Sequence, residues 1–209
     1  MSLAGLDGHV AVVTGGGAGI GEATAMKLAE AGAAVAILDR DQAAAARVAA
    51  AIQKAGGSSL AVDVDLSDTT AIPAAVERVV ERFGHIDILV QCAYVHGFYA
   101  GFSEKLLDVQ QADWDLAYTV NVKAPLLLMQ QIARHMIERG TAGRIVNVTS
   151  TSAFRADSPP VYGSSKAALT QLSRTAAAEL GPHGITVNCV APALTRTPSA
   201  LAVHGDEKL

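Results

Sequence analysis

Glycines crowd one turn near the start of the chain, the segment from Thr14 to Gly21. An apolar run, Val10 to Thr14, predicts a buried strand before this turn, and the stretch from Gly19 to Ala31 predicts a helix after it. In such a strand–turn–helix unit, backbone N–H groups and the helix N-terminus can hold a pyrophosphate, which glycines allow to come close. The turn therefore predicts a phosphate site, although its spacing, Gly15-x-x-x-Gly19-x-Gly21, is not GxGxxG.

The alternation of strand and helix continues along the chain. Such alternation requires parallel strands with right-handed crossovers and helices on both faces, so the predicted fold class is α/β with a doubly wound parallel sheet, the Rossmann fold. No repeat or linker divides residues 1–209, which we expect to form a single domain. Further strands are predicted at 34–39, 59–63, 86–90, 144–149 and 185–190, and further helices near 42–55, 69–83, 113–138 and 161–180.

The charge balance and the cysteines exclude several classes of partner. The formal net charge is -4, with no basic run, so nucleic acid and anionic membrane are not expected as partners and a small molecule is. Because there is no apolar run of about 18 residues and no secretion signal, we expect a cytoplasmic protein without a membrane span. Cys92 and Cys189 lie far apart and outside any Cys/His cluster, which predicts neither a disulfide nor a metal site.

Tyr162 and Lys166 lie four residues apart in the last predicted helix. This spacing places both side chains on one face, with the ammonium beside the phenol ring. A neighbouring positive charge favours the phenolate, so Lys166 would lower the pKa of Tyr162 toward the operating pH of a general acid/base. Alone, the pair would be an exposed aromatic beside a solvated lysine. Together with the glycine turn in one α/β chain, it predicts hydride-transfer chemistry.

Asp39 ends the second predicted strand, eighteen residues after Gly21. A carboxylate at this place can accept hydrogen bonds from the adenosine ribose and repel a 2′-phosphate, which favours NAD over NADP. Arg40 follows directly and could contact a 2′-phosphate, or it could be a solvated loop charge. NAD is therefore the expected cofactor, and NADP is the less favoured one.

Further motifs follow in a set order along the chain. They are Asp65-Leu66-Ser67-Asp68, Phe83-Gly84-x-x-Asp87, Asn121 in Val120-Asn121-Val122, Ser150 after Ile145-Val146-Asn147-Val148-Thr149, Tyr162-Gly163-Ser164-Ser165-Lys166, and Pro192. With the Thr14–Gly21 turn and Asp39, this order resembles the short-chain dehydrogenase/reductase family over residues 6–198. The resemblance implies an NAD(P)-dependent oxidoreductase that interconverts a secondary alcohol and a ketone. A homodimer or homotetramer is expected, with helices 113–138 and 161–180 as the dimer contact.

The resemblance also implies a role for each matching residue. Tyr162 would exchange the proton, Ser150 would hydrogen-bond the substrate oxygen, and Lys166 would bind the nicotinamide ribose. Asn121 would hold a water that relays protons to Lys166. Asp65 would contact the adenine through its side chain, and Leu66 would do so through its backbone. The cofactor-binding residues that it implies are Gly15, Gly17, Gly19, Ile20, Gly21, Asp39, Arg40, Asp65, Leu66, Ala93, Tyr162, Lys166 and Pro192.

Several polar and aromatic residues have a second interpretation. Ser150 could merely cap the end of its strand, with Ser152 a rival for its role, and Asn121 could be a buried helix residue satisfied locally. Arg155 and Asp157 could orient a charged substrate or be loop charges. The loop from 91 to 105 could form a pocket wall or pack on a neighbouring helix or subunit; its aromatic residues are Tyr94, His96, Phe98, Tyr99 and Phe102.

The chain departs from the family pattern in three places. Gln91-Cys92-Ala93-Tyr94 replaces the usual Asn-Asn-Ala-Gly, so polar ties of the sheet are lost and Tyr94 must swing away, stack nearby or partly occupy the cofactor's place. Pro192-Ala193 replaces Pro-Gly and adds a methyl beside the expected nicotinamide site. The chain ends before the family's last helix and strand, so we expect a C-terminally short, six-stranded sheet.

These departures support an alternative function, a catalytically weak nucleotide-binding or scaffolding protein of the same fold. A dehydratase or epimerase using the same Tyr162–Lys166 pair gains nothing specific from these residues.

Overall fold

A computed structural model describes residues 5–101, 103, 105–198 and 200–201. In this part of the chain, six parallel strands form one sheet in the order β3-β2-β1-β4-β5-β6. The chain winds outward from β1 in both directions, which is the doubly wound plan that the sequence predicted. The strands are β1 (Val10–Thr14), β2 (Ala34–Asp39), β3 (Ser59–Asp63), β4 (Ile88–Gln91), β5 (Arg144–Val148) and β6 (Thr186–Val190).

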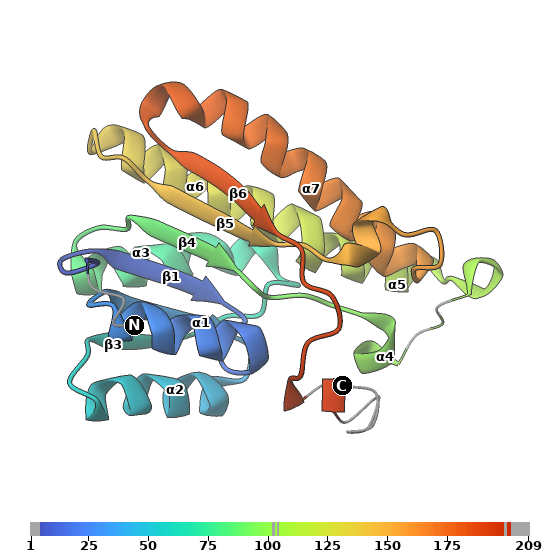
Figure 1. Cartoon of the computed structure of the whole chain (residues 1–209), viewed down its shortest axis with the longest axis horizontal. Coiled ribbons are helices and arrows are strands. Elements are labelled where there is room, and N and C mark those ends of the chain that lie inside the picture. Colours follow the sequence, from blue (N-terminus) through green and yellow to red (C-terminus); the bar gives the residue numbers. More distant parts are fainter. Residues whose placement is uncertain (1–4, 102, 104, 199, 202–209) are drawn as a thin grey trace.

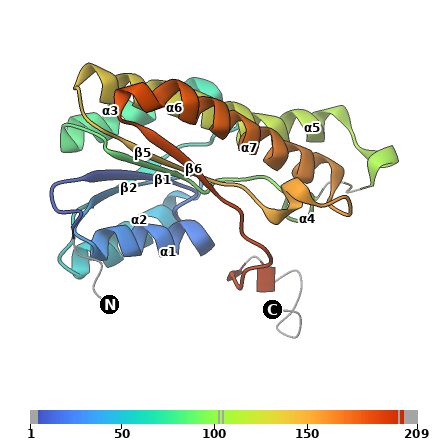
Figure 2. The same ribbon diagram turned by 45° about the horizontal axis from the view of Figure 1, so that its top comes forward.

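Helices cover both faces of the sheet, as Figures 1 and 2 show. On one face lie α1 (Gly19–Glu30) and α2 (Gln42–Lys54). On the other lie α3 (Ile72–Phe83), α6 (Ala124–Glu138) and α7 (Pro160–Leu180), and α5 (Gln111–Tyr118) extends this layer past the ends of the strands. The shorter helical segments are η1 (Thr69–Ala71), α4 (Gly97–Ala100), η2 (Leu106–Asp108), η3 (Thr119–Lys123), η4 (Thr151–Phe154) and η5 (Gly181–His183).

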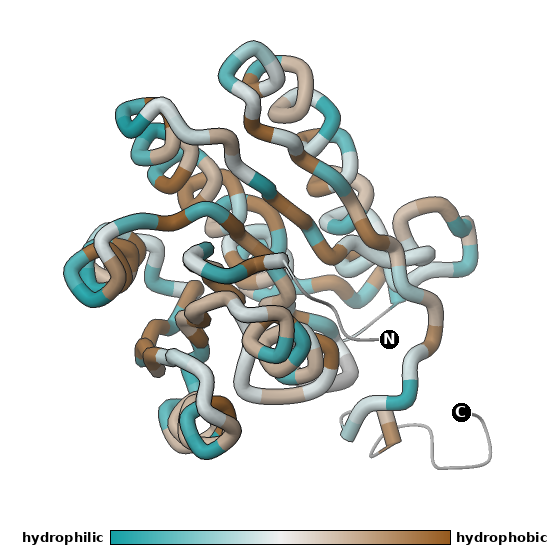
Figure 3. Tube along the Cα trace, turned by 60° about the vertical axis from the view of Figure 1, so that its left-hand side comes forward, coloured by the Kyte–Doolittle hydropathy of each residue, from teal (hydrophilic) through white to brown (hydrophobic). Residues whose placement is uncertain are grey.

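The alternation of side chains along β1 builds a core on each face of the sheet. All five residues of β1 are buried, because helices cover the strand on both sides. Val12 packs into the core with α3 and α6, whereas Val13 packs into the core with α1 and α2. Figure 3 shows hydrophobic residues along the inner strands and hydrophilic residues on the outer turns of the helices. This double burial explains why the strands read as near-continuous apolar runs in the sequence.

The helix predicted over 113–138 is continuous in the structure but contains a π-helical segment. It divides into α5, the π-helical segment η3 and α6. A π-turn adds one residue to a helical turn without changing the apolar character of the segment, so hydrophobic periodicity does not reveal it. Such turns inside α-helices often occur at functional sites, and η3 contains Asn121.

β6 forms one edge of the described sheet, and its Asn188, Cys189 and Val190 are exposed. Within the described ranges the sheet has six strands, as expected. Among the helices of the described part, none is long and apolar enough to cross a membrane.

Candidate active site

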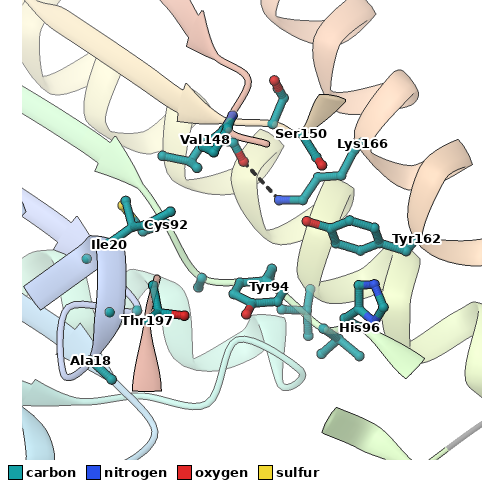
Figure 4. Close-up of a pocket in the computed structure, with 18 of the residues that line it drawn as sticks. Ala18, Ile20, Cys92, Tyr94, His96, Val148, Ser150, Tyr162, Lys166 and Thr197 are labelled. Carbon is teal, nitrogen blue, oxygen red and sulfur yellow. Dashed lines mark hydrogen bonds between the residues drawn. The ribbon is translucent and has the colours of Figure 1, made fainter. Parts of the chain in front are cut away.

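A cavity of about 520 Å³ opens where the strands end at their carboxyl termini. The glycine turn lines one side of this cavity, and Ser150, Tyr162 and Lys166 line the other (Figure 4). Two predicted site residues, Gly17 and Asn121, lie outside its lining. The predicted residues that line it are Gly15, Gly19, Ile20, Gly21, Asp39, Arg40, Asp65, Leu66, Ala93, Ser150, Tyr162, Lys166 and Pro192.

The glycine turn packs so closely that larger residues would not fit. Gly15 has a φ of +63°, and a Cβ added there would lie 2.8 Å from the Cα of Ala93. A Cβ on Gly21 would lie 2.0 Å from the carbonyl oxygen of Gly15. Ala18, the N-cap of α1, has no side chain that could cap the first N–H groups of the helix. A helix N-terminus of this kind, at the edge of a cavity, fits the pyrophosphate of a dinucleotide.

Two side chains hold the peptide groups of Gly17. Its N–H donates to Asp39 Oδ2 at 2.8 Å, and Arg47 Nη2 donates to its carbonyl oxygen at 2.9 Å. Arg47 also makes a bidentate pair with Glu22, at 2.7 and 2.8 Å, and this pairing lowers the pKa of Glu22. Asp39 therefore anchors the turn as well as lining the cavity. The sequence did not predict this role of Arg47, because Arg47 lies thirty residues after Gly17, in an alanine-rich helix that carries no motif.

Helix α7 places Tyr162 and Lys166 one turn apart on the cavity side. Lys166 Nζ lies 5.8 Å from the centre of the Tyr162 ring, and the Tyr162 hydroxyl points toward the Lys166 amine (Figure 4). Nζ donates a hydrogen bond to the carbonyl oxygen of Val148 at 2.9 Å. Lys166 is only 2% exposed, and this burial lowers its pKa to about 8, an effect that a thiolate at Cys92 would oppose. The lysine can therefore exchange a proton near neutral pH.

The pKa of the Cys92 thiol, which lies close to Lys166, is shifted upward, in the direction opposite to that of the lysine. Burial raises the pKa of Cys92 to about 11, although Lys166 and a hydrogen bond with Thr24 oppose the change. Cys92 is thus a neutral thiol at neutral pH, and Lys166 has no thiolate partner there.

Ser150 follows β5 and lines the cavity. Its Oγ accepts a hydrogen bond from the Ser152 N–H at 3.1 Å, so it also caps the turn η4. Ser152 lines the cavity as well, so the structure keeps both serines as candidates for binding a substrate oxygen. Arg155 lines the cavity too and pairs with the exposed Asp157 at 2.6 Å.

The Asn121 side chain is fully buried and satisfied by its neighbours. Its Oδ1 accepts from the Val95 N–H at 2.7 Å, and its Nδ2 donates to the Val95 carbonyl at 2.9 Å and to Ser165 Oγ at 3.0 Å. Asn121 therefore fixes the loop after β4 against α7. The water relay implied for this residue stays a prediction.

The Tyr94 ring lies between the glycine-turn side of the cavity and Tyr162 (Figure 4). Its centre is 6.1 Å from that of the Tyr162 ring, in an edge-on arrangement, and 5.7 Å from Lys166 Nζ. The centre of the His96 ring lies 4.3 Å from that of the Tyr162 ring, in a tilted arrangement. The Tyr94 ring lines the cavity beside Lys166 and so does not swing away from it; its overlap with the cofactor's place stays a prediction. Phe102 lies outside the described residues, as do the side chains of Phe98 and Tyr99.

Gln91 corrects one expectation. The sequence predicted that polar ties of the sheet are lost where Gln91 replaces an asparagine. Instead, Gln91 Nε2 donates to Asn147 Oδ1 at 2.9 Å and to the Pro125 carbonyl at 3.2 Å, and Asn147 Nδ2 donates to Ser173 Oγ at 2.7 Å. The longer glutamine side chain reaches across from β4 to β5, so the tie is kept.

Comparison with known proteins decides the family. The family model for short chain dehydrogenases matches residues 9–208. The chain belongs to the short-chain dehydrogenase/reductase family. It is 40% identical over 189 residues to the short-chain reductase protein NovJ of Streptomyces niveus, a match that covers 90% of this chain and 70% of that protein. The resemblance inferred from the motifs is confirmed, and the protein is an oxidoreductase of this family.

Solved structures of family members share the fold. One is a 7α-hydroxysteroid dehydrogenase complexed with NADH and 7-oxo glycochenodeoxycholic acid, at 35% identity and a TM-score of 0.89, covering 99% of this chain and 78% of that one. Another is a 3-ketoacyl-(acyl-carrier-protein) reductase from Brucella melitensis complexed with NADH, at 34% identity and a TM-score of 0.87, covering 98% of this chain and 82% of that one.

In the described part of this chain, no group of three or more His, Cys, Asp and Glu side chains could hold a metal ion.

Proposed function

We propose that this short-chain dehydrogenase/reductase transfers a hydride between NAD and a small secondary alcohol or ketone, with Tyr162 as the proton-exchanging residue. One observation carries the proposal. Tyr162, Lys166 and Ser150 line the same cavity as the glycine turn, with the Tyr162 hydroxyl directed toward the Lys166 amine (Figure 4). This shared cavity supports the proposal, because the predicted phosphate site and the predicted proton-exchange residues lie together in it.

The proposed chemistry divides between the cofactor and the chain. The nicotinamide accepts or supplies the hydride. In alcohol oxidation, Ser150 Oγ hydrogen-bonds the substrate oxygen, and the Tyr162 phenolate takes the hydroxyl proton as the ketone forms. A charged Lys166 beside the ring favours that phenolate, and its amine binds a ribose hydroxyl. In ketone reduction, Tyr162 returns the proton to the substrate oxygen.

The proposed preference for NAD rests on Asp39. Its carboxylate lines the cavity at the end of β2, where a 2′-phosphate would bring a second negative charge close to it. Arg40 lines the same part of the cavity and is exposed, so it remains the residue through which NADP could bind. The complexes of related enzymes with NADH support NAD as the first cofactor to test.

A second candidate is a catalytically weak nucleotide-binding member of the family. It is supported by the Tyr94 ring beside Lys166 and by the burial of that lysine. Both candidates require the dinucleotide to bind, so binding alone does not separate them. They differ in whether an alcohol or ketone is turned over.

A screen of secondary alcohols with NAD and with NADP separates them through the absorbance of reduced nicotinamide. We expect turnover with NAD, and a loss of about 100-fold or more in Tyr162→Phe, the usual scale for a general acid/base. Tyr118→Phe is the matched control, because Tyr118 stacks on Trp114 in α5, outside the cavity lining. Equal turnover in wild type and Tyr162→Phe would remove Tyr162 from the mechanism. Binding of NAD without turnover of any alcohol would favour the second candidate.

We also propose a cytoplasmic homodimer or homotetramer built from one domain. The exposed Trp114 and Leu116 on α5 support a subunit contact through this helix and α7. Size-exclusion chromatography with light scattering measures the assembly.

A further inference from the structure

The connection between β5 and α7 joins Ser150 to Tyr162, the two residues proposed to act on the substrate oxygen, and several of its residues line the cavity. The turn η4, which Ser150 caps, begins the connection. Pro159 and Pro160 end it at the start of α7, and their rings fix two backbone dihedrals there. Arg155 lies between these two ends and lines the cavity. Its place beside the proposed reaction site is therefore held from both sides.

The carboxylates of the cavity lining lie at the other end of the sheet. They are Asp39, at the end of β2, and Asp65, just after β3. Arg155 follows β5, and β1 and β4 lie between β2 and β5, so these two strands are about 14 Å apart. This separation exceeds the Debye length of about 8 Å at physiological ionic strength. A negative group beside Arg155 therefore meets a cation and is little repelled by the carboxylates of the lining.

The Arg155 guanidinium uses one edge for a contact within the chain. Nε donates to Asp157 Oδ1 at 2.9 Å, and Nη2 donates to Asp157 Oδ2 at 2.6 Å. A guanidinium has five N–H groups. Within the described ranges Asp157 is its one hydrogen-bond partner, so the two N–H groups of Nη1 and one of Nη2 remain. Two parallel donors at that end match the two oxygens of a second carboxylate.

A smaller pocket of about 190 Å³ lies next to the cavity at Arg155. The two share Ser152, Arg155 and Pro159 in their linings, and Ser158 and Ser164 also line the smaller one. Hydroxyl groups of three serines therefore surround the place where the arginine borders both spaces. These groups suit the charged end of a substrate better than its carbon chain.

We propose that Arg155 binds a carboxylate of the substrate, so that the favoured substrates are secondary hydroxy acids and the matching keto acids. The inference rests on the proposed function, because it names the substrate class of the same site. The carboxylate accepts hydrogen bonds from the Nη1 end of Arg155 while the carbinol oxygen lies at Ser150 and Tyr162. Charge-assisted pairing favours the acid over a neutral analogue, and the exposure of the arginine keeps this preference modest.

The first test compares each hydroxy acid with its own amide, which has nearly the same shape and no charge. The acids are 3-hydroxybutyrate, 4-hydroxypentanoate and 5-hydroxyhexanoate, which place the carboxylate at increasing distance from the carbinol carbon. The quantity measured is the ratio of kcat/KM for the acid to that for the amide, with NAD. Because both values come from the same protein, changes in folding or in NAD binding cancel in the ratio.

Arg155→Gln should lower the acid-to-amide ratio about fivefold for the acid of matching length. Arg78→Gln, at an exposed position of α3 outside the cavity lining, makes the same change of net charge and should keep the wild-type ratio. An equal ratio in wild type and Arg155→Gln for every acid would overturn the proposal.

Asp157→Asn provides a variant in which the effect has the opposite sign. It keeps an acceptor beside Arg155 but removes the negative charge that competes with the substrate, so the acid-to-amide ratio should rise. Loss of a merely structural ion pair would change the turnover of acid and amide alike. If Arg155→Gln does not fold, an unchanged ratio in Asp157→Asn would overturn the proposal.

The second test requires no turnover. Pentanoate and pentanamide are titrated into protein with isotope-labelled arginine, and the Nε–H signal of Arg155, assigned by its loss in Arg155→Gln, is followed by NMR. Pentanoate should shift this signal, and pentanamide should not. Equal shifts with the two compounds, or no shift with either, would overturn the proposal.

The two tests separate the carboxylate site from the proposed function. A shift with pentanoate alone, without turnover of any alcohol, would support the site and contradict the proposed function. Turnover of neutral alcohols, with equal acid-to-amide ratios in all the proteins, would support the proposed function and overturn the site.

Discussion

Replacement of Lys166 by methionine should stabilise the protein at neutral pH while removing its activity. Burial lowers the pKa of Lys166 from its ordinary value of 10.5 to about 8. This lowering of the pKa corresponds to about 3 kcal/mol, by which the charged amine reduces the free energy of unfolding. Methionine has a similar length and no charge. Loss of the hydrogen bond to the Val148 carbonyl costs about 1–3 kcal/mol and offsets part of this gain.

The pH dependence of the free energy of unfolding separates the effect of the lysine charge from the other effects of the substitution. The folded pKa lies below the unfolded one, so the unfavourable contribution of the lysine is fully present below about pH 8, shrinks as the pH rises from about 8 to about 10.5, and is absent above that range. The free energy of unfolding of Lys166→Met, minus that of wild type, should therefore decrease by about 3 kcal/mol across this window.

Urea unfolding of both proteins, from about pH 7 to about pH 10.5, measures this difference. Both proteins carry the Cys92→Ala change, because Cys92 and Lys166 affect each other's pKa and the thiol titrates near the upper end of this range. Lys54→Met, at an exposed helix position, is the control and should show no such change. A difference between Lys166→Met and wild type that stays constant over the window would refute the claim that burial destabilises the charged lysine.

Two further predictions concern the glycine turn. Arg47→Ala should weaken NADH binding severalfold in calorimetry, because it releases the Gly17 carbonyl and leaves the Glu22 charge unpaired near the phosphate site. Adding Glu22→Gln to this variant should restore part of the affinity. An affinity that is not restored would contradict the explanation. Asp39→Asn keeps an acceptor for the Gly17 N–H but removes the charge, so the ratio of NADP to NAD affinity should rise. An unchanged ratio would show that Asp39 does not select the cofactor.

Much of the fold could be predicted because the strands are buried on both faces. The bounds of β1, β2 and β3 match the predicted ranges to the residue, since each is an apolar run that ends at a polar residue or a glycine. β4 begins at Ile88, although Ile86 was predicted to start it. Ile86 is fully buried, so it reads as part of the strand, but it lies before the paired ladder. Apolar patterns record burial, and they do not record which residues pair.

In the candidate site, too, some features could be predicted from the sequence and others could not. Motifs predicted Tyr162, Lys166 and Ser150 as site residues, because the chemistry requires particular residue types at particular spacings, and all three line one cavity. The position of Tyr94 beside Lys166, and the hold of Arg47 on the glycine turn, depend on segments far apart in the sequence that meet only in the folded chain. A single sequence contains no local signal for such contacts.

The most direct test of the central claim follows hydrogen from the substrate. The best alcohol from the screen, deuterated at its carbinol carbon, is mixed with excess enzyme and NAD, and the mass of the reduced nicotinamide is measured over a single turnover. Wild type should transfer one deuterium to the nicotinamide, and Tyr162→Phe, at saturating NAD, should transfer it about 100-fold more slowly. Transfer at the wild-type rate in Tyr162→Phe, or reduced nicotinamide without deuterium, would contradict the account.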